Sequence, residues 1–237
     1  MIRTHAFNSV WWGSPVGISS DVQDLFQNPE QLSSESTKFD WIEFRIAFED
    51  LPTQKLGPSN GAQLVETQLT YQKNISRLGA CPGGVTILPA TQAPINVNNF
   101  SPFSHERYAK LRKVDANRLA LRYRQLADQL VENSPETCAS IFYKSSLVGY
   151  IFGHMKGTTA VFDLAVTSIN AQVSGQALYD AAGYMFNQAG ASRMTSSFNA
   201  ANLGALNAHV RMQCSFIEAT SIWLLESNVP NFGDERE

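Results

Sequence analysis

A strand-like run that leads through a glycine-containing turn into an amphipathic helix is the feature that most constrains this 237-residue chain. Residues 160–166 are largely apolar and predict a strand. Beyond the turn, apolar side chains recur at helical spacing, which predicts a helix with one buried face: Leu178, Ala181, Ala182, Met185, Phe186 and Ala189.

The turn is built from small and polar residues, in the order Gln172, Val173, Ser174, Gly175, Gln176 and Ala177. Such a loop can curl until its backbone N–H groups point at one spot, where the positive end of the following helix favours a phosphate. We therefore predict a phosphate-binding loop. The alternative is an ordinary strand–turn–helix unit in which Gly175 merely eases a tight turn.

The segments around this unit predict a mixed sheet. Residues 139–143 and 147–154 resemble the two strands of a hairpin, and a turn at Lys156, Gly157 and Thr158 leads into the strand at 160–166. A further strand at 193–198, a helix that begins near Asn202 and a last strand at 216–225 follow. The predicted order across residues 139–226 is β–β–β–α–β–α–β. A longer helix with an apolar stripe of Leu119, Tyr123, Leu126 and Leu130 precedes it.

Two motifs in this order resemble the GNAT superfamily of CoA-dependent N-acyltransferases. The loop at 172–177 is similar to the Q/R-x-x-G-x-G/A loop that binds the pyrophosphate of acyl-CoA in that family, and Asn202 opens an N-x-x-A-x-x-x-Y motif. The resemblance implies a GNAT fold (α/β or α+β), with a mixed, mostly antiparallel sheet flanked by helices. It also implies that Asn202 contacts the pantetheine arm. His209 stands where the family has the tyrosine that protonates the departing thiolate, and Gln213-Cys214 replaces Gly-Phe.

The first half of the chain predicts a separate, smaller α/β domain. Alternating residues Ile42, Phe44, Ile46 and Phe48 predict a strand at 41–48, and a second strand is expected at 64–71. Residues 78–102 are rich in Gly, Pro, Asn and Thr and predict a domain boundary or a long ordered loop. We therefore expect an N-terminal domain, 1–82, that contributes to the substrate site, and an acyl-CoA-binding catalytic domain, 83–237.

The two-part layout resembles the bacterial TDP-fucosamine acetyltransferases and related nucleotide-sugar N-acyltransferases. The similar features are the aromatic pair Trp11 and Trp12, the pair Arg107 and Tyr108, and Tyr123 in the long helix. The resemblance implies transfer of an acyl group to the amine of a dTDP-linked 3- or 4-amino-dideoxyhexose, for O-antigen or capsule synthesis. His105 is a further candidate at the substrate. Core packing of the aromatic residues and solvation of Arg107 are the alternatives.

The reaction needs a base for the amine, donors for the tetrahedral oxyanion and a proton for the thiolate. His154 and Asp163 are the side-chain base candidates, and a water chain ending at strand carbonyls is the alternative. Backbone groups of Leu164, Ala165 and Val166 are expected at the acyl-CoA, with N–H groups as the oxyanion donors. His209 is placed by the motif to donate the proton, although a lone histidine on a helix is commonly a surface or hydrogen-bonded core residue.

Composition and charge bear on which partners are expected. The net charge of −3 gives no basic surface typical of nucleic-acid binding and no polybasic patch typical of membrane binding. A transmembrane run and a signal peptide are both absent from the pattern, so a cytoplasmic protein is expected. The histidines lack metal-ligand spacing, which predicts no metal. Three alternatives stay open. The N-terminal strands can pair in a homodimer, the acceptor can be a different amine or a protein N-terminus, and the chain can be a non-catalytic CoA-binding domain.

Overall fold

The computed structural model of the protein describes residues 1–26, 32, 37–52, 58, 60–76, 81, 83–102, 105–169, 171 and 176–227. Contacts divide the chain into two compact units: Met1–Gln68, Lys110–Lys113 and Ala219–Glu237 form the first, and Leu69–Ala109 and Val114–Glu218 form the second. The strands β4 (Gln63–Asn74) and β10 (Ser215–Glu226) have residues in both units. The domains predicted at 1–82 and 83–237 are a different partition and stay a prediction.

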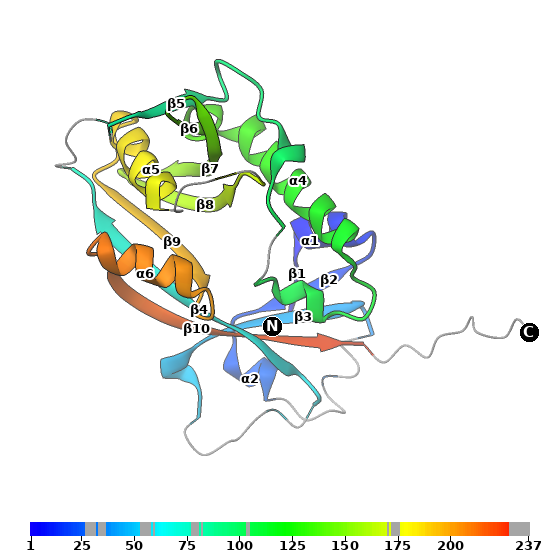
Figure 1. Cartoon of the computed structure of the whole chain (residues 1–237). Helices are drawn as coiled ribbons and strands as arrows, with labels where there is room; N and C mark the ends of the chain where they lie inside the picture. Colours follow the sequence, from blue (N-terminus) through cyan, green and yellow to red (C-terminus); the bar gives the residue numbers. More distant parts are fainter. Residues whose placement is uncertain are drawn as a thin grey trace, which may run out of the picture. The chain divides into compact units, whose positions relative to one another are not determined.

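The second unit contains the predicted hairpin and meander (Figure 1). Strand β6 (Ala139–Tyr143) pairs antiparallel with β7 (Ser146–Lys156), and β7 pairs antiparallel with β8 (Thr159–Thr167). Lys144 and Ser145 connect β6 to β7 with φ angles of 47° and 69°, which is the geometry of a tight two-residue hairpin turn. Gly157, with φ at 62°, occupies the second turn. These predictions are confirmed.

The rest of the predicted order is confirmed as well. Helix α5 (Gln176–Gln188) follows β8, and then come β9 (Arg193–Asn199), α6 (Leu203–Arg211) and β10. In the second unit the strand order is β4-β9-β8-β7-β6-β5, where β5 is Val85–Pro89. Strand β9 runs parallel to β8, whereas β5–β6, β6–β7 and β7–β8 are antiparallel pairs. The sheet is therefore mixed and mostly antiparallel.

Two irregularities in β8 matter for the site. The ladder between β8 and β9 consists of three pairs, in which residues 159–161 lie opposite residues 193–195. On the other side of β8, the register with β7 shifts between Phe152 and Gly153, because Phe152 pairs with Leu164 and Gly153 with Phe162. Asp163 is thus the extra residue of a β-bulge, a feature that redirects side chains and increases local twist.

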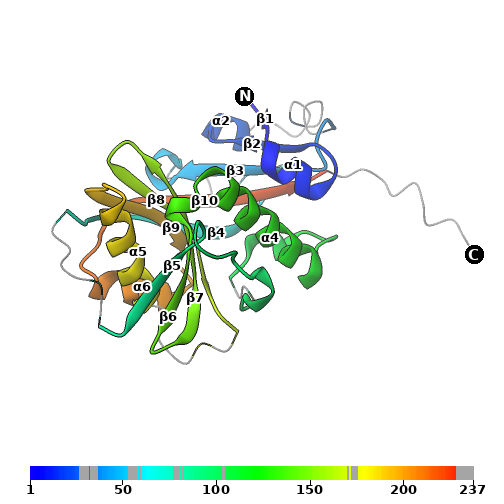
Figure 2. The ribbon, with the colours of Figure 1, turned by 90° about the horizontal axis from the view of Figure 1, so that it is seen from above.

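Helices cover both faces of these strands (Figure 2). Helix α5 packs its apolar face on one side, where Leu178, Ala182 and Phe186 join a core with Ile141 and Ile151. Helix α4 (Ala116–Asn133) covers the opposite face, where its predicted stripe contributes Tyr123, Leu126 and Leu130 to a second core. Because successive strand residues point to opposite faces, β7 and β8 supply both cores.

The predicted loop at 78–102 is partly wrong. It contains β5, which pairs along its whole length with β6, from Val85 opposite Tyr143 to Pro89 opposite Ala139. Short 3₁₀ turns, η2 (Val97–Asn99) and η3 (Arg107–Lys110), follow before α4. The Gly and Pro content correctly indicated turns in this stretch. It gave no indication of the five-residue edge strand β5, which is stabilised by pairing with β6.

The first unit is built from short elements. Its strand order is β1 (Arg3–Thr4), β2 (Val16–Ser19), β3 (Trp41–Ala47) and β10, with β2 and β3 parallel. Helices α1 (Ala6–Trp12) and α2 (Val22–Leu25) and the 3₁₀ turn η1 (Phe48–Asp50) complete it. Ile42, Phe44 and Ile46 are fully buried, as their alternation predicts. The expectation for Phe48 is wrong, because β3 ends one residue earlier and Phe48 is exposed in η1.

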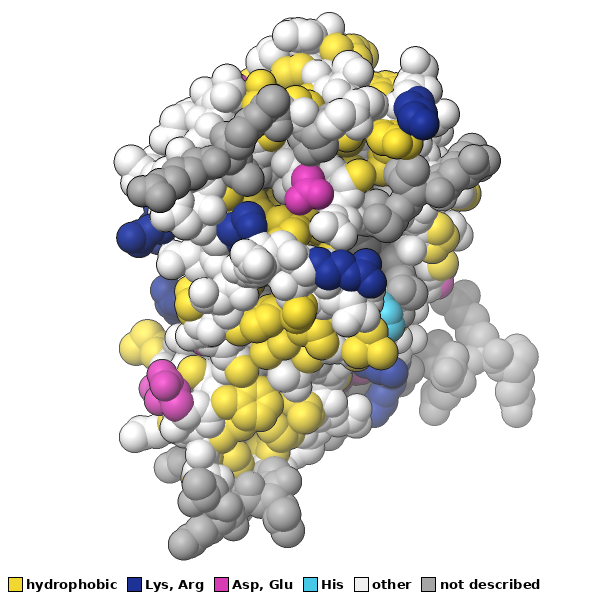
Figure 3. All heavy atoms as spheres, turned by 60° about the vertical axis from the view of Figure 1, so that its left-hand side comes forward, with side chains coloured by type: hydrophobic (Ala, Val, Ile, Leu, Met, Phe, Trp, Pro, Cys, Tyr) yellow, Lys and Arg dark blue, Asp and Glu magenta, His cyan; other side chains and the backbone are white. Residues whose placement is uncertain are grey.

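Hydrophobic side chains are also exposed. Leu203 and Val210 of α6 and Ile217 of β10 each keep more than half of their surface accessible. Figure 3 shows hydrophobic side chains at the surface on the side where these elements lie. Among the helices that the structure describes, none is both long enough and apolar enough to cross a membrane.

Candidate functional site

A cleft of about 510 Å³ lies within the second unit. Three segments and a loop form its walls: the end of β8, the first turn of α5, the length of α6, and the residues before η3. The lining residues are Ser101, Pro102, His105, Ala165, Val166, Thr167, Gln176, Leu178, Tyr179, Asn202, Gly204, Ala205, Asn207, Ala208 and Arg211.

The β8 wall exists because β8 and β9 separate after a short parallel ladder (Figure 1). Ser196 Oγ still donates a hydrogen bond to the carbonyl of Phe162, at 2.5 Å. Beyond that point Ala165 and Val166 line the cleft. A strand edge that is released in this way can hold an extended ligand through its backbone groups. Leu164 also belongs to β8, and its side chain packs in the core beneath α4.

Two helices begin at this cleft. Gln176, the first residue of α5, lines it, and Ala177 follows inside the helix. Residues Gln172, Val173, Ser174 and Gly175 of the predicted phosphate loop lie outside the described residues. Asn202 lines the cleft and is the N-cap of α6, because its Oδ1 accepts a hydrogen bond from Ala205 N at 3.0 Å. Helix N-termini carry partial positive charge, so the beginnings of α5 and α6 favour an anion in the cleft.

His209 does not line the cleft but is buried behind it in α6, with 1% of its surface exposed. Its ring stacks on Phe198, with 4.6 Å between centroids and 8° between planes, and lies 3.9 Å from the ring of Tyr71 and 4.5 Å from that of Tyr179. Nδ1 donates a hydrogen bond to the carbonyl of Ala205 at 2.6 Å. Burial lowers the pKa of His209, and the bond to Ala205 raises it to a smaller extent.

Acid is expected to destabilise the protein through His209. Because its pKa in the folded protein lies below the ordinary 6.5, the unfolded chain takes up the proton first as the pH falls. The stability associated with neutral His209 is complete above the unfolded pKa and is lost as the pH falls through it towards the folded pKa. His209→Phe keeps an aromatic ring in the cluster and removes this titration. We expect thermal unfolding of the variant to depend less on pH than that of the wild type between about pH 7 and 5. An identical dependence in the two proteins would contradict the assignment.

His154 of β7 and Asp163 of β8 are brought together as a hydrogen-bonded pair. His154 Nδ1 lies 2.6 Å from Asp163 Oδ2, across the bulge described above. Burial raises the pKa of Asp163 above its ordinary 3.8, and the hydrogen bond and charge of His154 lower it to a smaller extent. The His154 side chain is 41% exposed, so the pair is open to solvent. Neither residue lines the cleft itself.

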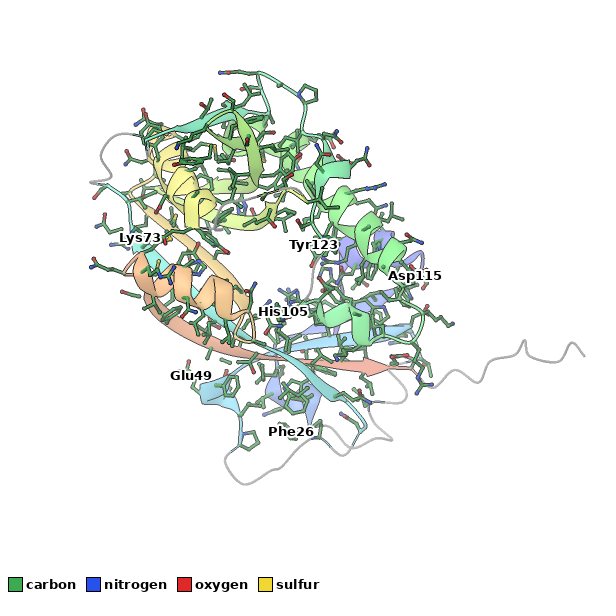
Figure 4. All side chains as sticks on the ribbon, viewed as in Figure 1. Phe26, Glu49, Lys73, His105, Asp115 and Tyr123 are labelled. Atoms are coloured by element: carbon green, nitrogen blue, oxygen red, sulfur yellow. The ribbon has the colours of Figure 1, made fainter. Side chains whose placement is uncertain are left out.

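The predicted substrate residues of the second unit occupy different environments. His105 is exposed and lines the cleft (Figure 4). Tyr108 is fully buried, with the guanidinium carbons of Arg107 and Arg122 at 4.9 Å and 4.4 Å from its ring centroid. Tyr123, labelled on α4 in Figure 4, packs partly buried against the core beneath that helix. Among these four predicted residues, His105, Arg107, Tyr108 and Tyr123, His105 alone lines the cleft.

Trp11 and Trp12 belong to the core of the first unit, with 5% and 9% of their surface exposed. Their rings pack edge to face at 5.6 Å, and Trp12 makes a similar contact with Trp41 at 5.8 Å. The Trp12 Nε1–H donates to Asp40 Oδ2 at 2.8 Å. Packing in the core is therefore sufficient to explain why two adjacent tryptophans occur here. A role of this pair in binding a nucleotide base stays a prediction.

Sequence reasoning did not identify Tyr179, Asn207 and Arg211, all of which line the cleft. Tyr179 lies three residues after Gln176, and Arg211 lies four residues after Asn207. Each pair is therefore one helical turn apart on the same face, which is a signal that the periodicity contained. This spacing could not identify the cleft residues, because the sequence does not show which face of each helix meets the cleft.

The chemistry of the cleft residues is that of hydrogen bonding and proton transfer. Among the residues that the structure describes, no group of three or more His, Cys, Asp or Glu side chains is placed to hold a metal ion. Arg211 supplies a positive charge, and Ser101, Thr167, Gln176 and Asn207 supply neutral polar groups.

Comparison with known proteins bears on the fold. No protein-family model matches the sequence, and no curated protein matches it. The structure is similar to that of a GCN5-related N-acetyltransferase from Sphaerobacter thermophilus, with a TM-score of 0.54 and 13% identity over 84% of this chain. This chain spans 65% of that protein. A functionally unknown conserved protein from Staphylococcus epidermidis has a TM-score of 0.56 and 14% identity, with 90% of this chain and 84% of that chain covered. The chain therefore has the fold of the GCN5-related N-acetyltransferases, as its motifs predicted.

Proposed function

We propose that this protein is an N-acyltransferase that moves an acyl group from acyl-CoA to an amine. The observation that carries the proposal is the cleft in which the released edge of β8 meets the beginnings of α5 and α6. A strand edge suits the amide-containing pantetheine arm, which can pair with it as an extra strand would. The helix N-termini and Arg211 suit the phosphates of the nucleotide end.

The chemistry follows from the groups present. The His154–Asp163 pair takes a proton from the ammonium of the acceptor, directly or through water. The free amine attacks the thioester carbonyl, and backbone N–H groups in the 164–166 stretch of β8 stabilise the oxyanion. Collapse of the tetrahedral intermediate forms the amide and releases the CoA thiolate, which takes up a proton.

The acceptor we favour is the amine of a dTDP-linked 3- or 4-amino-dideoxyhexose, in cytoplasmic synthesis of a surface polysaccharide such as O-antigen or capsule. Support comes from the similarity to nucleotide-sugar N-acyltransferases at Trp11, Trp12, Arg107, Tyr108 and Tyr123. Among the residues proposed for this acceptor, His105 is the one that lines the cleft.

Release of CoA thiol by the purified protein tests the proposal. Acetyl-CoA and short-chain acyl-CoAs are paired with dTDP-linked 3-amino and 4-amino sugars, with small polyamines and with peptides that have free N-termini. We expect release that requires one amino sugar and one thioester. Release with another amine alone would overturn the sugar assignment and keep the reaction. CoA binding in calorimetry without release from any pair would overturn the transfer reaction in favour of a binding role.

A further inference from the structure

The departing thiolate needs a proton donor, and the geometry of His209 is unsuited to that task. The carbonyl of Ala205 can only accept a hydrogen bond, so the proton of the neutral imidazole is on Nδ1, which contacts that carbonyl at 2.6 Å. The other ring nitrogen, Nε2, is buried and has no hydrogen-bond partner among the described residues. It therefore carries a lone pair, and His209 has no second proton to give while it stays neutral.

Tyr179 lies between this histidine and the cleft. It lines the cleft from the first turn of α5, next to Gln176 and Leu178. Its ring is held against Phe162, at 5.7 Å and 75°, and against His209, at 4.5 Å. Two aromatic neighbours thus support the ring of a residue that reaches the cavity. Burial raises the pKa of Tyr179 to about 12, so the phenol stays protonated at neutral pH.

The other titratable or charged groups nearby are less suited. In the described lining of the cleft these are His105 and Arg211. Arginine does not release a proton in proteins. His105 is exposed on the segment before η3, whereas the ring of Tyr179 is held by Phe162 and His209. Tyr71 of β4 also contacts the ring of His209, at 3.9 Å, but it is 1% exposed and does not line the cleft.

We propose, resting on the function above, that Tyr179 donates its hydroxyl proton to the sulfur of the departing CoA thiolate. The amine nitrogen forms its bond to the acyl carbon, the carbon–sulfur bond breaks, and its electron pair stays on sulfur. The Tyr179 proton moves to that sulfur. The base releases to solvent the proton that it took from the amine. The Tyr179 phenolate takes up a proton from solvent, so the protons balance over the cycle. His209 acts as a positioning residue, because its neutral ring supports Tyr179.

Tyr179→Phe tests the role while preserving the ring contacts. General acids contribute about 10²–10⁴-fold to rate, and because a thiolate is a good leaving group we expect kcat to fall about 100-fold. KM for acyl-CoA and thermal stability should be unchanged. Tyr184→Phe is the matched control, because Tyr184 lies on the same helix but does not line the cleft, and it should behave as the wild type.

The pH dependence separates the two candidate donors. If Tyr179 donates, kcat does not fall as the pH rises through neutrality, because the phenol remains protonated. If the imidazolium of His209 donates, kcat falls with rising pH already below the ordinary histidine pKa of 6.5. A falling limb in that range, or wild-type kcat in Tyr179→Phe, would overturn the role of Tyr179.

A measurement without turnover keeps this role separate from the proposed reaction. The thiol of bound CoA is titrated by the ultraviolet absorbance of its thiolate, in the wild type and in Tyr179→Phe. A donor at the sulfur stabilises the thiolate, so we expect a lower thiol pKa on the wild type than on the variant. Equal values would overturn the contact even if the enzyme turns over. A wild type that shows this difference but releases no thiol would instead count against the transfer reaction alone.

Discussion

Gly149→Ala is expected to destabilise the protein by about 3 kcal/mol, at the upper end of the usual overpacking cost. A Cβ at Gly149 would lie 2.2 Å from the carbonyl oxygen of Val166 and 2.9 Å from Thr167 Cα, and 3.1 Å from Leu178 Cδ1. The two closest atoms belong to the backbone of β8, so no side-chain rotation relieves the clash. For a chain of this size, about 2–4 °C per kcal/mol corresponds to a fall in Tm of roughly 6–12 °C.

The same substitution should weaken acyl-CoA binding. Val166 and Thr167, which the new methyl group displaces, line the cleft. Gly83→Ala is the matched control, because no atom lies within 4 Å of a Cβ at Gly83 and its backbone is not in the left-handed region. Thermal unfolding and calorimetry of the two variants measure both effects. A Gly149→Ala protein with wild-type Tm would contradict the packing of β7 against β8.

Asp163→Asn is expected to lower kcat/KM for transfer by about 10²–10³-fold, which is within the range of general base catalysis. The amide keeps the size of the carboxyl but cannot accept a proton or draw one from the amine through His154, whose Nδ1 lies 2.6 Å away. Asp128→Asn on the exposed surface of α4 makes the same change of charge away from the pair and should keep full activity. Wild-type kcat/KM in Asp163→Asn would exclude the pair as the base and favour a water chain.

Asp163→Asn is expected to lower activity but not stability. The pKa of Asp163 is raised in the folded protein, chiefly by burial, so the folded state binds its proton more tightly than the unfolded chain does. Stability from this group is therefore present at low pH and lost as the pH rises through its folded pKa, which leaves an unfavourable charge at neutral pH. Asp163→Asn carries no such charge, and we expect its Tm at pH 7 not to fall below that of the wild type.

Periodicity was sufficient for elements whose own residues determine their structure. The hairpin of β6 and β7, the buried face of α5 and the apolar stripe of α4 all follow from local spacing. It was insufficient for β5 and α1. Strand β5 is five residues long and is stabilised by pairing with β6, and α1 depends on caps at His5 and Gly13 rather than on a stripe. Short elements gain their stability from partners, which a local pattern does not contain.

The sequence by itself determined the order of strands and helices from residue 139 onward, and therefore the fold and the position of Asn202 and Gln176 at the start of their helices. The tertiary structure alone decided the chemistry of the side chains. His209 occupies the motif position of a proton donor, yet burial lowers its pKa and its Nδ1 proton is held by the carbonyl of Ala205, whereas Tyr179 from another helix reaches the cleft. Spacing along a chain places a residue on an element, but its protonation and exposure depend on which other elements pack around it.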